Sequence, residues 1–307
     1  MKIAIFGLGR MGMQIAKRLH KFTPTQAPGN KFDVLAWNRS EAPREDFQSF
    51  GGKAYAEVKS LADAMAEQPR IFWLMLPHEI VEEFLQNQLG PFLKTGDIVI
   101  DGGNSFYKVS IKRAKELGER GIIFYDCGTS GGVWGFNNGF ALMVGGPKEQ
   151  WPIVEPIFKI LSSGKNYGLV GNNGAGHFVK MVHNGIEYGM MEAIAEGYGV
   201  LEASPFKLEL KQVSKIYQEG SVVKSWLIDL VRDIFENEDV DAVKGFIATT
   251  GEGEWTVKTG KELGVDVRVI EDALKVRQES AEEKNQQKFS NKIVALLRKQ
   301  FGGHEVK

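Results

Sequence analysis

Residues 2–21 read KIAIFGLGRMGMQIAKRLHK, and this segment is the strongest indication of the fold of the first half of the chain. Its apolar run Lys2–Phe6 is typical of a buried parallel strand. The residues Met11–Lys21 that follow have the composition and spacing of a helix. A strand that leads through a glycine-rich turn into a helix predicts the first half of a βαβ unit.

The turn between them matches the pattern G-x-G-x-x-G. Its residues are Gly7, Leu8, Gly9, Arg10, Met11 and Gly12. Gly7 permits a tight turn, Gly9 lets a pyrophosphate approach the backbone, and Gly12 lets helix and strand pack closely. Such a pattern also arises by chance in a glycine-rich chain, but here it follows a strand and opens a helix. We therefore predict that the six residues bind a dinucleotide at the N-terminus of the helix.

Further strands and helices alternate along the first half. Short apolar runs bounded by Gly, Pro, Asn or Asp occupy Phe32–Trp37, Ile71–Leu76, Asp97–Ile100, Gly121–Tyr125 and Ala141–Val144. The helical candidates between them are Glu79–Asn87, Tyr107–Arg120 and Lys148–Ser162. The alternation predicts an α/β doubly wound (Rossmann) domain. The segment Thr23–Asn30, with two prolines and a glycine, is expected to be a surface loop.

From residue 174 the strand patterns stop. The remaining chain predicts helices over Gly176–Ala203, Leu208–Gln218, Val223–Asn237, Glu254–Leu263 and Val269–Phe301. Within the last of these, Ala281–Lys288 is interpreted as a solvated helix face. We therefore expect a dinucleotide-binding domain over residues 1–173 and an all-α C-terminal domain over residues 174–307.

Composition limits the classes of function. The 307 residues contain 38 Lys and Arg against 39 Asp and Glu, which gives no reason to expect nucleic acid or a membrane surface as partner. The single cysteine, Cys127, cannot form an internal disulfide, and no apolar run reaches the about 18 residues of a membrane span. No dense group of His, Asp and Glu indicates a metal. These features predict a cytoplasmic protein.

The end of the second strand bears on the choice of cofactor. An NAD-selective site usually has Asp or Glu here, to bind the ribose 2′-hydroxyl. This chain has Asn38, Arg39 and Ser40 instead. The Arg39 guanidinium can pair with a 2′-phosphate, so NADP is favoured and NAD stays possible. The alternative is that Arg39 is an exposed residue without a role.

A stripe of polar residues marks one predicted helix. Lys180, His183, Asn184, Glu187 and Tyr188 share one helical face, and apolar residues fill much of the remaining circumference. We call these five residues the polar stripe. We expect the helix to be buried, and buried Lys and Glu need partners or a cleft. A desolvated lysine beside a carboxyl suits acid–base chemistry, because burial lowers the pKa of a lysine amine. A structural network of the same residues is the alternative.

Two glycine-rich loops and a strand end are expected near the dinucleotide. One loop contains Asp101, Asn104 and Ser105, and the other contains Thr129, Ser130, Gly131 and Gly132. Met75, Leu76 and Pro77 end the third strand and are positioned to contact a nicotinamide ring. All follow strand carboxyl ends, where open α/β sheets place ligands.

The motifs GLGRMG, NRS, DGGNS, TSGG and GAGHFVKMVHNGIEYG together resemble the decarboxylating 6-phosphogluconate dehydrogenases, in their short form. The resemblance covers the whole chain and places it in the β-hydroxyacid dehydrogenase superfamily. It implies conversion of 6-phosphogluconate to ribulose 5-phosphate and CO2 with NADP or NAD, a step of the pentose phosphate pathway and of gluconate utilisation.

The resemblance also implies roles for residues. Lys180 would be the general base and Glu187 the general acid. The sugar acid would contact Asn104, Ser130, Gly131, Gly132, Lys180, His183, Asn184 and Glu187, and Asn104 would also lie at the cofactor. Tyr188 and Arg277 would face the phosphate. Arg298 and His304 would belong to a tail that completes the site of a neighbouring subunit in a homodimer or homotetramer.

One segment departs from the family pattern. Family members carry a lysine and a threonine, two residues apart, before a Trp-Thr pair, whereas this chain has Thr250 and Glu252 before Trp255. A cation expected at the phosphate is therefore replaced. Two other functions stay open: oxidation of a non-phosphorylated β-hydroxy acid, as in 3-hydroxyisobutyrate-type dehydrogenases, and a non-catalytic dinucleotide sensor.

Overall fold

The computed structural model describes residues 1–22, 32–66, 69–249 and 251–306. The predicted loop at Thr23–Asn30 and residue Thr250 therefore lie outside the described residues. The chain forms two compact units, Met1–Lys180 and Met181–Lys307. The boundary expected from the sequence, between residues 173 and 174, lies just before helix α8 (Ala175–Glu202), which belongs to both units.

The first unit is built on one sheet, with strand order β3-β2-β1-β4-β5-β6-β7-β8 in the described residues. Its strands are β1 (Lys2–Phe6), β2 (Asp33–Trp37), β3 (Lys53–Tyr55), β4 (Ile71–Leu74), β5 (Ile98–Asp101), β6 (Ile123–Ser130), β7 (Ala141–Gly145) and β8 (Tyr167–Gly171). All neighbours pair in parallel except β6 with β7. The chain order reverses beside β1, so the carboxyl ends of β1 and β4 form the switch point where such sheets bind ligands.

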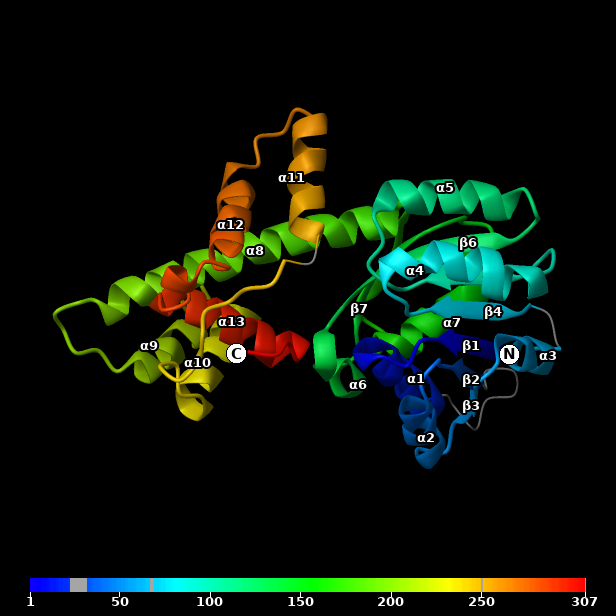
Figure 1. Cartoon of the computed structure of the whole chain (residues 1–307), viewed down its shortest axis with the longest axis horizontal. Helices are drawn as coiled ribbons and strands as arrows, with labels where there is room; N and C mark the ends of the chain where they lie inside the picture. Colours follow the sequence, from blue (N-terminus) through cyan, green and yellow to red (C-terminus); the bar gives the residue numbers. More distant parts are fainter. Residues whose placement is uncertain (23–31, 67–68, 250, 307) are drawn as a thin grey trace. The chain divides into compact units, whose positions relative to one another are not determined.

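Helices cover both faces of this sheet (Figure 1). One face carries α1 (Arg10–Phe22), α2 (Glu41–Ser49) and α7 (Trp151–Leu161). The other carries α3 (Val58–Ala64), α4 (His78–Glu83), the π-helix η1 (Phe84–Leu89) and α5 (Tyr107–Gly118). Short turns, η2 (Gly90–Phe92), η3 (Gly132–Trp134) and α6 (Gly135–Asn138), complete the unit. The predicted doubly wound α/β fold is therefore confirmed.

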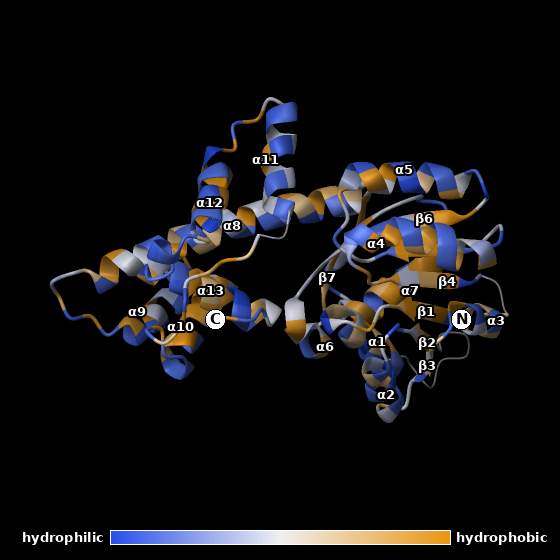
Figure 2. Ribbon diagram, viewed as in Figure 1, coloured by the Kyte–Doolittle hydropathy of each residue, from blue (hydrophilic) through white to orange (hydrophobic). Residues whose placement is uncertain are grey.

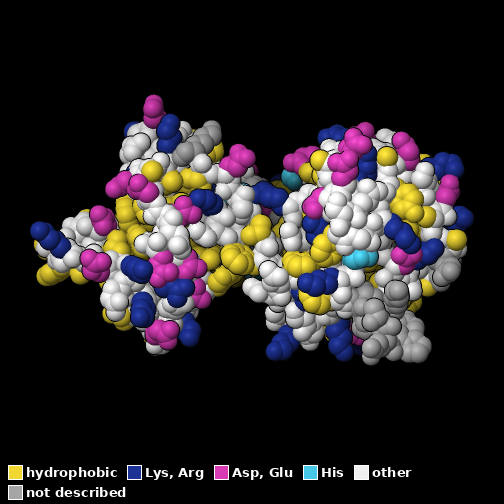
Figure 3. Space-filling view, turned by 90° about the horizontal axis from the view of Figure 1, so that it is seen from below, with side chains coloured by type: hydrophobic (Ala, Val, Ile, Leu, Met, Phe, Trp, Pro, Cys, Tyr) yellow, Lys and Arg dark blue, Asp and Glu magenta, His cyan; other side chains and the backbone are white. Residues whose placement is uncertain are grey.

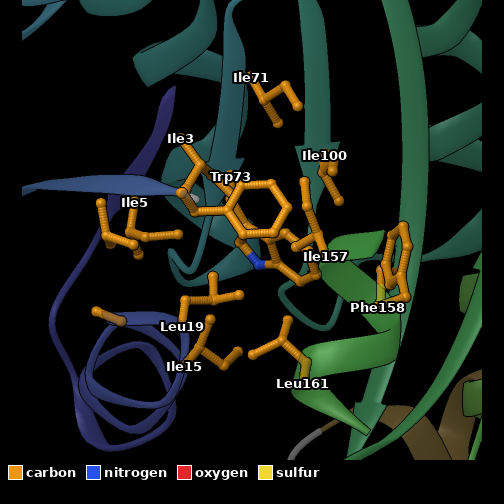
Figure 4. Close-up of a cluster of buried hydrophobic side chains, with 14 of the residues drawn as sticks. Ile3, Ile5, Ile15, Leu19, Ile71, Trp73, Ile100, Ile157, Phe158 and Leu161 are labelled. Carbon is orange, nitrogen blue, oxygen red and sulfur yellow. The ribbon is translucent and has the colours of Figure 1, made fainter. Parts of the chain in front are cut away.

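The core on the α1 and α7 face is built around Trp73 of β4, which is fully buried. In Figure 4, Ile3 and Ile5 of β1, Ile15 and Leu19 of α1, and Ile157 of α7 surround its ring. The central strands β4 and β5 are buried along their whole length, because helices cover both faces of the sheet, and Figure 2 colours β4 as hydrophobic. This burial is why the strands were recognisable in the sequence as short continuous apolar runs.

Some elements of the first unit were not predicted. The strand β3 has only three residues and none of them is buried, and β8 has no buried residue either, so neither shows an apolar run. The helices α2, α3 and α6 were also missed. The strand β6 is longer than predicted: it continues through Thr129 to Ser130, because antiparallel pairing with β7 extends it. Ser130 therefore ends a strand and does not lie in the loop beyond it.

The second unit is helical, as predicted. Besides most of α8 it contains α9 (Leu210–Gln218), α10 (Trp226–Asn237), α11 (Glu252–Glu262), α12 (Arg268–Glu279), the 3-10 turn η4 (Glu283–Asn285) and α13 (Phe289–Gly302). Its core brings together apolar side chains of α8, α10, α12 and α13. Met191 of α8, Val231 of α10 and Ile293 of α13 are fully buried there.

The prediction of one helix over Val269–Phe301 is wrong. The chain ends α12 at Glu279 and begins α13 at Phe289. The Asn285 side chain donates a hydrogen bond to the Glu279 carbonyl, and the Ser280 hydroxyl accepts one from the Ile247 N–H. The bond from Asn285 satisfies the Glu279 carbonyl, a backbone group that a continuous helix would have used, and the Ser280 hydroxyl is engaged by a residue outside the helix. The run Ala281–Lys288 is thus a turn and not a helix face.

Candidate active site

The glycine-rich turn after β1 has the geometry expected of a dinucleotide-binding loop. Gly7 has a backbone φ of 98°, and a Cβ atom there would lie 2.5 Å from the Met75 carbonyl oxygen. A Cβ at Gly12 would lie 2.0 Å from the Gly7 carbonyl oxygen. A Cβ at Gly9, by contrast, would meet no described heavy atom within 4 Å. Two glycines are therefore required by packing, and the third leaves the backbone at the start of α1 open to a ligand.

The end of β2 contacts this turn directly. The Asn38 side-chain oxygen accepts a hydrogen bond from the Leu8 N–H, at 2.9 Å. Arg39 and Ser40 are exposed, and Ser40 precedes α2. Arg44 on α2 donates to the carbonyl oxygens of Asn38 and Arg39. Asn38 therefore holds the loop, whereas the Arg39 side chain is exposed beside it. Arg44 was not singled out in the sequence, since nothing in its spacing marked it.

The residues after β4 lie beside the same loop. The Met75 N–H donates to the Phe6 carbonyl at the end of β1, at 2.7 Å, and the Met75 sulfur accepts from the Trp73 ring N–H. Pro77 precedes α4. Met75, Leu76 and Pro77 thus stand at the switch point of the sheet, as the sequence placed them.

A buried aspartate, Asp101, fixes the loop after β5 through hydrogen bonds. Asp101 accepts hydrogen bonds from the Gly103 N–H and the Ser105 hydroxyl, and it forms an ion pair with Arg113 at 2.6 Å. Asn104 between them is exposed. Asp101 and Ser105 are structural, and their bonds present the Asn104 side chain at the carboxyl end of β5. The residues Gly131 and Gly132 follow β6 and are half-buried.

The start of α8 is anchored by Asp126, a residue that the sequence analysis did not identify. Its two carboxylate oxygens accept hydrogen bonds from the N–H groups of Gly174 and His177, at 2.6 and 2.8 Å. Burial raises the pKa of Asp126, while the charge of His177 and these N–H groups act in the opposite direction. The His177 ring in turn contacts the Ser110 hydroxyl at 2.7 Å. A capping carboxylate at this position fixes the register of the helix that follows.

Because Asp126 fixes the start of α8, Lys180 on this helix lies against β6. It is 7% exposed, and a Cβ placed on Gly128 would lie 2.2 Å from the Lys180 Cβ. Gly128 therefore has to be a glycine for the lysine to approach the strand. The catalytic candidate is buried within the first unit, at a position determined by Asp126 and Gly128.

The other members of the polar stripe continue along α8. The His183 ring lies 3.0 Å from the Asn184 side-chain oxygen and 3.8 Å from a carboxylate oxygen of Glu187. Asn184 is buried, whereas His183 and Glu187 are half-buried. Lys180 and Glu187 are seven residues apart on one continuous helix, so they share a face about two turns long. The stripe thus combines a buried amine with a carboxyl that solvent or a ligand can reach.

At the end of the stripe, Arg277 of α12 stacks on Tyr188. The guanidinium carbon lies 3.2 Å from the centroid of the Tyr188 ring, and both residues are buried. Within the described residues, the Arg277 Nη2 atom has no hydrogen-bond partner. Burial lowers the pKa of Arg277 to about 10, so the group is cationic at neutral pH. A buried cation with an unused donor is suited to bind an anion.

A second buried arginine lies within electrostatic range of Arg277. Arg298 lies on α13, is buried, and contributes electrostatically to the lowered pKa of Arg277 in the same chain. The resemblance implied that Arg298 belongs to a tail that completes the site of a neighbouring subunit, and this stays a prediction. His304 follows α13 and is half-buried.

The expectation that α8 is buried around its circumference is wrong for the single chain. Val179, Ile186 and Met190 are exposed, Ile186 by 53%, and Val200 is exposed by 72%. Three members of the polar stripe, Lys180, Asn184 and Tyr188, are buried, whereas these apolar side chains of the same helix are exposed. This is the reverse of a helix on the surface of a monomer.

In the described part of the chain, no three His, Cys, Asp or Glu side chains come together in a way that could hold a metal ion. None of the helices within the described ranges combines the length and the hydropathy of a membrane span.

Family models cover both units. The model for the NAD binding domain of 6-phosphogluconate dehydrogenase matches residues 2–171, and that for the 6-phosphogluconate dehydrogenase C-terminal domain matches residues 176–305. The fold is also shared with 3-hydroxyisobutyrate dehydrogenase from Salmonella typhimurium, with a TM-score of 0.74 at 16% identity. That similarity concerns the fold alone, over 95% of this chain and 98% of the other.

Individual relatives agree with the family models. A Bacillus subtilis protein named "Putative 6-phosphogluconate dehydrogenase YqeC" is 40% identical over 99% of this chain and 98% of its own. The NAD(+)-dependent decarboxylating 6-phosphogluconate dehydrogenase of Haloferax volcanii is 35% identical over 100% and 98%. The structure of Plasmodium falciparum 6-phosphogluconate dehydrogenase gives a TM-score of 0.81 at 28% identity, over 91% of this chain and 62% of that longer one. The chain therefore belongs to the 6-phosphogluconate dehydrogenase family of oxidoreductases and carries its NAD-binding domain, as its motifs predicted.

Proposed function

We propose that this protein oxidises and decarboxylates 6-phosphogluconate to ribulose 5-phosphate and CO2, with NADP or NAD as the oxidant. The observation that carries the proposal is the polar stripe of α8. It presents a buried lysine and a partly accessible carboxyl on one helix face, and its last residue is stacked under a buried arginine. An amine, an acid and an anion site are the groups that this reaction requires.

The turn after β1 fits a dinucleotide. The open backbone at Gly9 would take the pyrophosphate at the N-terminus of α1, and Met75 to Pro77 would line the nicotinamide. When bound, the cofactor accepts the hydride from the third carbon of the sugar acid. The protein's own contribution is to position the substrate and to move protons.

Lys180 in its neutral form takes the proton of the hydroxyl on the third carbon. Oxidation of that carbon gives a β-keto acid, whose carbonyl accepts the electron pair when the bond to the carboxylate carbon breaks and CO2 leaves. The Lys180 ammonium then stabilises the oxygen on which negative charge develops. The product of this step is an enediol.

Glu187 is assigned the final proton transfer. Its carboxyl donates a proton to the first carbon of the enediol, while Lys180, which had given its proton to the developing oxygen, takes that proton back from the enol hydroxyl, and the ketone of ribulose 5-phosphate results. His183 and Asn184, which contact each other on the same face, would bind the sugar hydroxyls together with Asn104, Ser130, Gly131 and Gly132. Tyr188, Arg277 and Arg298 would hold the phosphate.

Steady-state kinetics on the whole protein tests this function. The assay follows nucleotide reduction and CO2 release with 6-phosphogluconate, gluconate and 3-hydroxyisobutyrate, each with NADP and with NAD. We expect the highest kcat/KM with 6-phosphogluconate and one CO2 per nucleotide reduced. Faster oxidation of a non-phosphorylated acid would support the 3-hydroxyisobutyrate-type function. Tight NADPH binding without turnover of any sugar acid would indicate a sensor.

We further propose that NADP is preferred, because the exposed Arg39 follows β2 where an acidic residue would select NAD. The Arg39→Ala variant should raise KM for NADP about tenfold, the effect of losing one charge-assisted hydrogen bond of about 1.4 kcal/mol. KM for NAD in the same variant should not change, and it serves as the internal control. Equal effects on both cofactors would contradict the assignment of Arg39 to the 2′-phosphate.

We also propose that the protein is a homodimer or homotetramer, supported by apolar side chains exposed on the second unit. They include Ile186, Met190, Val200, Phe206, Ile216, Val222 and Trp226. Figure 3 shows hydrophobic side chains gathered on the surface of this unit. Many large apolar side chains exposed on one unit are typical of a protein interface.

A mixing experiment tests whether the segment after α13 acts in the partner subunit. The Lys180→Met variant and a variant truncated after Gly302 are each expected to be inactive. If the tail with His304 completes the neighbour's site, half of the randomly mixed dimers contain one intact site, and about a quarter of wild-type activity returns. If the tail acts within its own chain, co-refolding the two variants restores no activity. Size-exclusion chromatography with light scattering confirms that mixed oligomers have formed.

A further inference from the structure

Glu192 is a buried acid to which the proposed reaction gives no role. It lies on α8 one turn beyond Tyr188 and is only 6% exposed. Within the described residues, its Oε1 atom has no hydrogen-bond partner. A buried carboxyl that is left without a partner is unfavourable for folding, so its presence calls for a functional explanation.

The charges around Glu192 come from three parts of the second unit. Arg277 on α12 and Lys288, just before α13, act on it as cations, and Glu196 on α8 acts as an anion. Arg277 in turn is influenced by Arg298, Glu187 and Glu192. Glu192 therefore lies within electrostatic range of Arg277, one of the two arginines that we assign to the phosphate.

Glu192 and Arg277 are close enough to interact, yet the described residues show no ion pair between them within 4 Å. Each keeps an unsatisfied polar atom, Oε1 of Glu192 and Nη2 of Arg277. Arg277 is 3% exposed and is held on the Tyr188 ring. The guanidinium is thus positioned by stacking, and its donor is not consumed by the neighbouring carboxylate. A ligand anion that binds to this donor therefore interacts electrostatically with the Glu192 carboxylate.

We propose that Glu192 takes up a proton from solvent when a phosphate ester binds at Arg277, and so makes the affinity for phosphorylated substrate depend on pH. This inference rests on the proposed function, because it requires the phosphate end of the substrate to lie at Arg277 and Arg298. An ionised Glu192 partly neutralises Arg277 and repels the phosphate. A protonated Glu192 does neither, so Arg277 then acts on the phosphate with its full charge.

Glu192 ionises near neutral pH, where the pH dependence of substrate affinity can be measured. Burial, together with the charge of Glu196, raises the pKa of Glu192 to about 7, although Arg277 and Lys288 lower it. Above pH 7 the acid is mostly ionised in the free protein and must be protonated on binding, so affinity falls as pH rises. Below pH 6 it is already protonated, and affinity should not depend on it. Arg277, with a pKa of about 10, stays cationic throughout.

Isothermal titration of the full chain with 6-phosphogluconate, at pH 6.5 and at pH 8.5, tests the proposal. For the wild type we expect Kd to rise about tenfold between the two pH values, since a group with a pKa near 7 is ionised over this interval. Titration at pH 8 in two buffers of different ionisation enthalpy should show uptake of close to one proton. The phosphate ester is already a dianion at pH 8, because its second pKa is about 6, so it does not contribute.

The Glu192→Gln variant keeps the shape of the side chain and removes its titration. Its Kd at pH 8.5 should be about as low as that of the wild type at pH 6.5, and its proton uptake at pH 8 should vanish. The Glu202→Gln variant, on an exposed residue of the same helix, should behave as the wild type. Gluconate, which lacks the phosphate, should show no proton uptake with any variant.

Three results would overturn the proposal: wild-type binding without proton uptake at pH 8, equal pH dependence in Glu192→Gln, or a higher Kd of that variant at every pH. The last would mean that Glu192 only holds Arg277 in place. If Glu192→Gln does not fold, Glu192→Met and the two-buffer measurement on the wild type decide the matter. Absence of any 6-phosphogluconate binding would instead refute the proposed function itself.

Discussion

Replacement of Lys180 by methionine should lower kcat for 6-phosphogluconate by about three orders of magnitude or more. The variant loses the general base, which contributes about 10²–10⁴-fold, and also the ammonium that stabilises the developing oxyanion. Methionine retains the length of the aliphatic chain, so packing against Gly128 is preserved. The measurement is steady-state kcat with saturating substrate and each cofactor.

The controls separate chemistry from folding. The dissociation constant for NADPH, followed by fluorescence, should remain within about twofold of the wild type, because the glycine-rich turn after β1 is unchanged. Lys112→Met, an exposed lysine on α5, should leave kcat unaltered. Turnover of Lys180→Met within about tenfold of the wild type would remove Lys180 from the role of base.

Much of the first unit could be predicted because its signals are local. The turn at Gly7–Gly12, the strand before it and the helix after it are adjacent in sequence, and each glycine has its own steric reason. Strands buried on both faces leave continuous apolar runs, which made β1, β2, β4 and β5 visible. The polar stripe was visible for the same reason, since helical periodicity relates its residues directly.

The parts that were missed depend on contacts between distant residues. Asp126 on β6 caps α8 at Gly174, 48 residues later in the chain, and nothing in the surrounding sequence indicates this bond. Gly128 is required only because Lys180 packs on it. The break between α12 and α13 results from side-chain hydrogen bonds, such as that from Asn285 to Glu279, which periodicity does not report. Glu192 was not identified in the sequence because the cation that acts on it, Arg277, lies on another helix, α12.

The exposed side of α8 shows a different limit of sequence analysis. Apolar residues around a helix predict burial, but they do not state which molecule buries them. In a single chain Ile186 and Met190 are exposed. The same pattern therefore fits a helix buried within one chain and a helix covered by a second copy, and only the oligomeric state distinguishes the two.

Replacement of Arg277 by methionine should weaken binding of 6-phosphogluconate by about 10–100-fold, the equivalent of the about 1.5–3 kcal/mol of a hydrogen bond to a charged group. The guanidinium is buried on Tyr188 and has an unused donor, so its loss removes a cation that the fold has already positioned. Because positioning is complete before the ligand arrives, little of the interaction energy is spent on ordering the side chain. The effect should appear in KM and kcat/KM for 6-phosphogluconate.

Two comparisons show whether this effect comes from the phosphate. The kcat/KM of any residual activity on gluconate should be the same for Arg277→Met and for the wild type, because gluconate has no group to pair with the guanidinium. Arg268 is an exposed arginine at the start of the same helix, and the Arg268→Met variant should have the wild-type kcat/KM for both substrates. A parallel loss on both substrates would show that Arg277 supports the fold through Tyr188. A loss confined to the phosphorylated substrate would identify α12 as the element that recognises the phosphate, and would explain how the site functions although Thr250 stands where relatives carry a lysine.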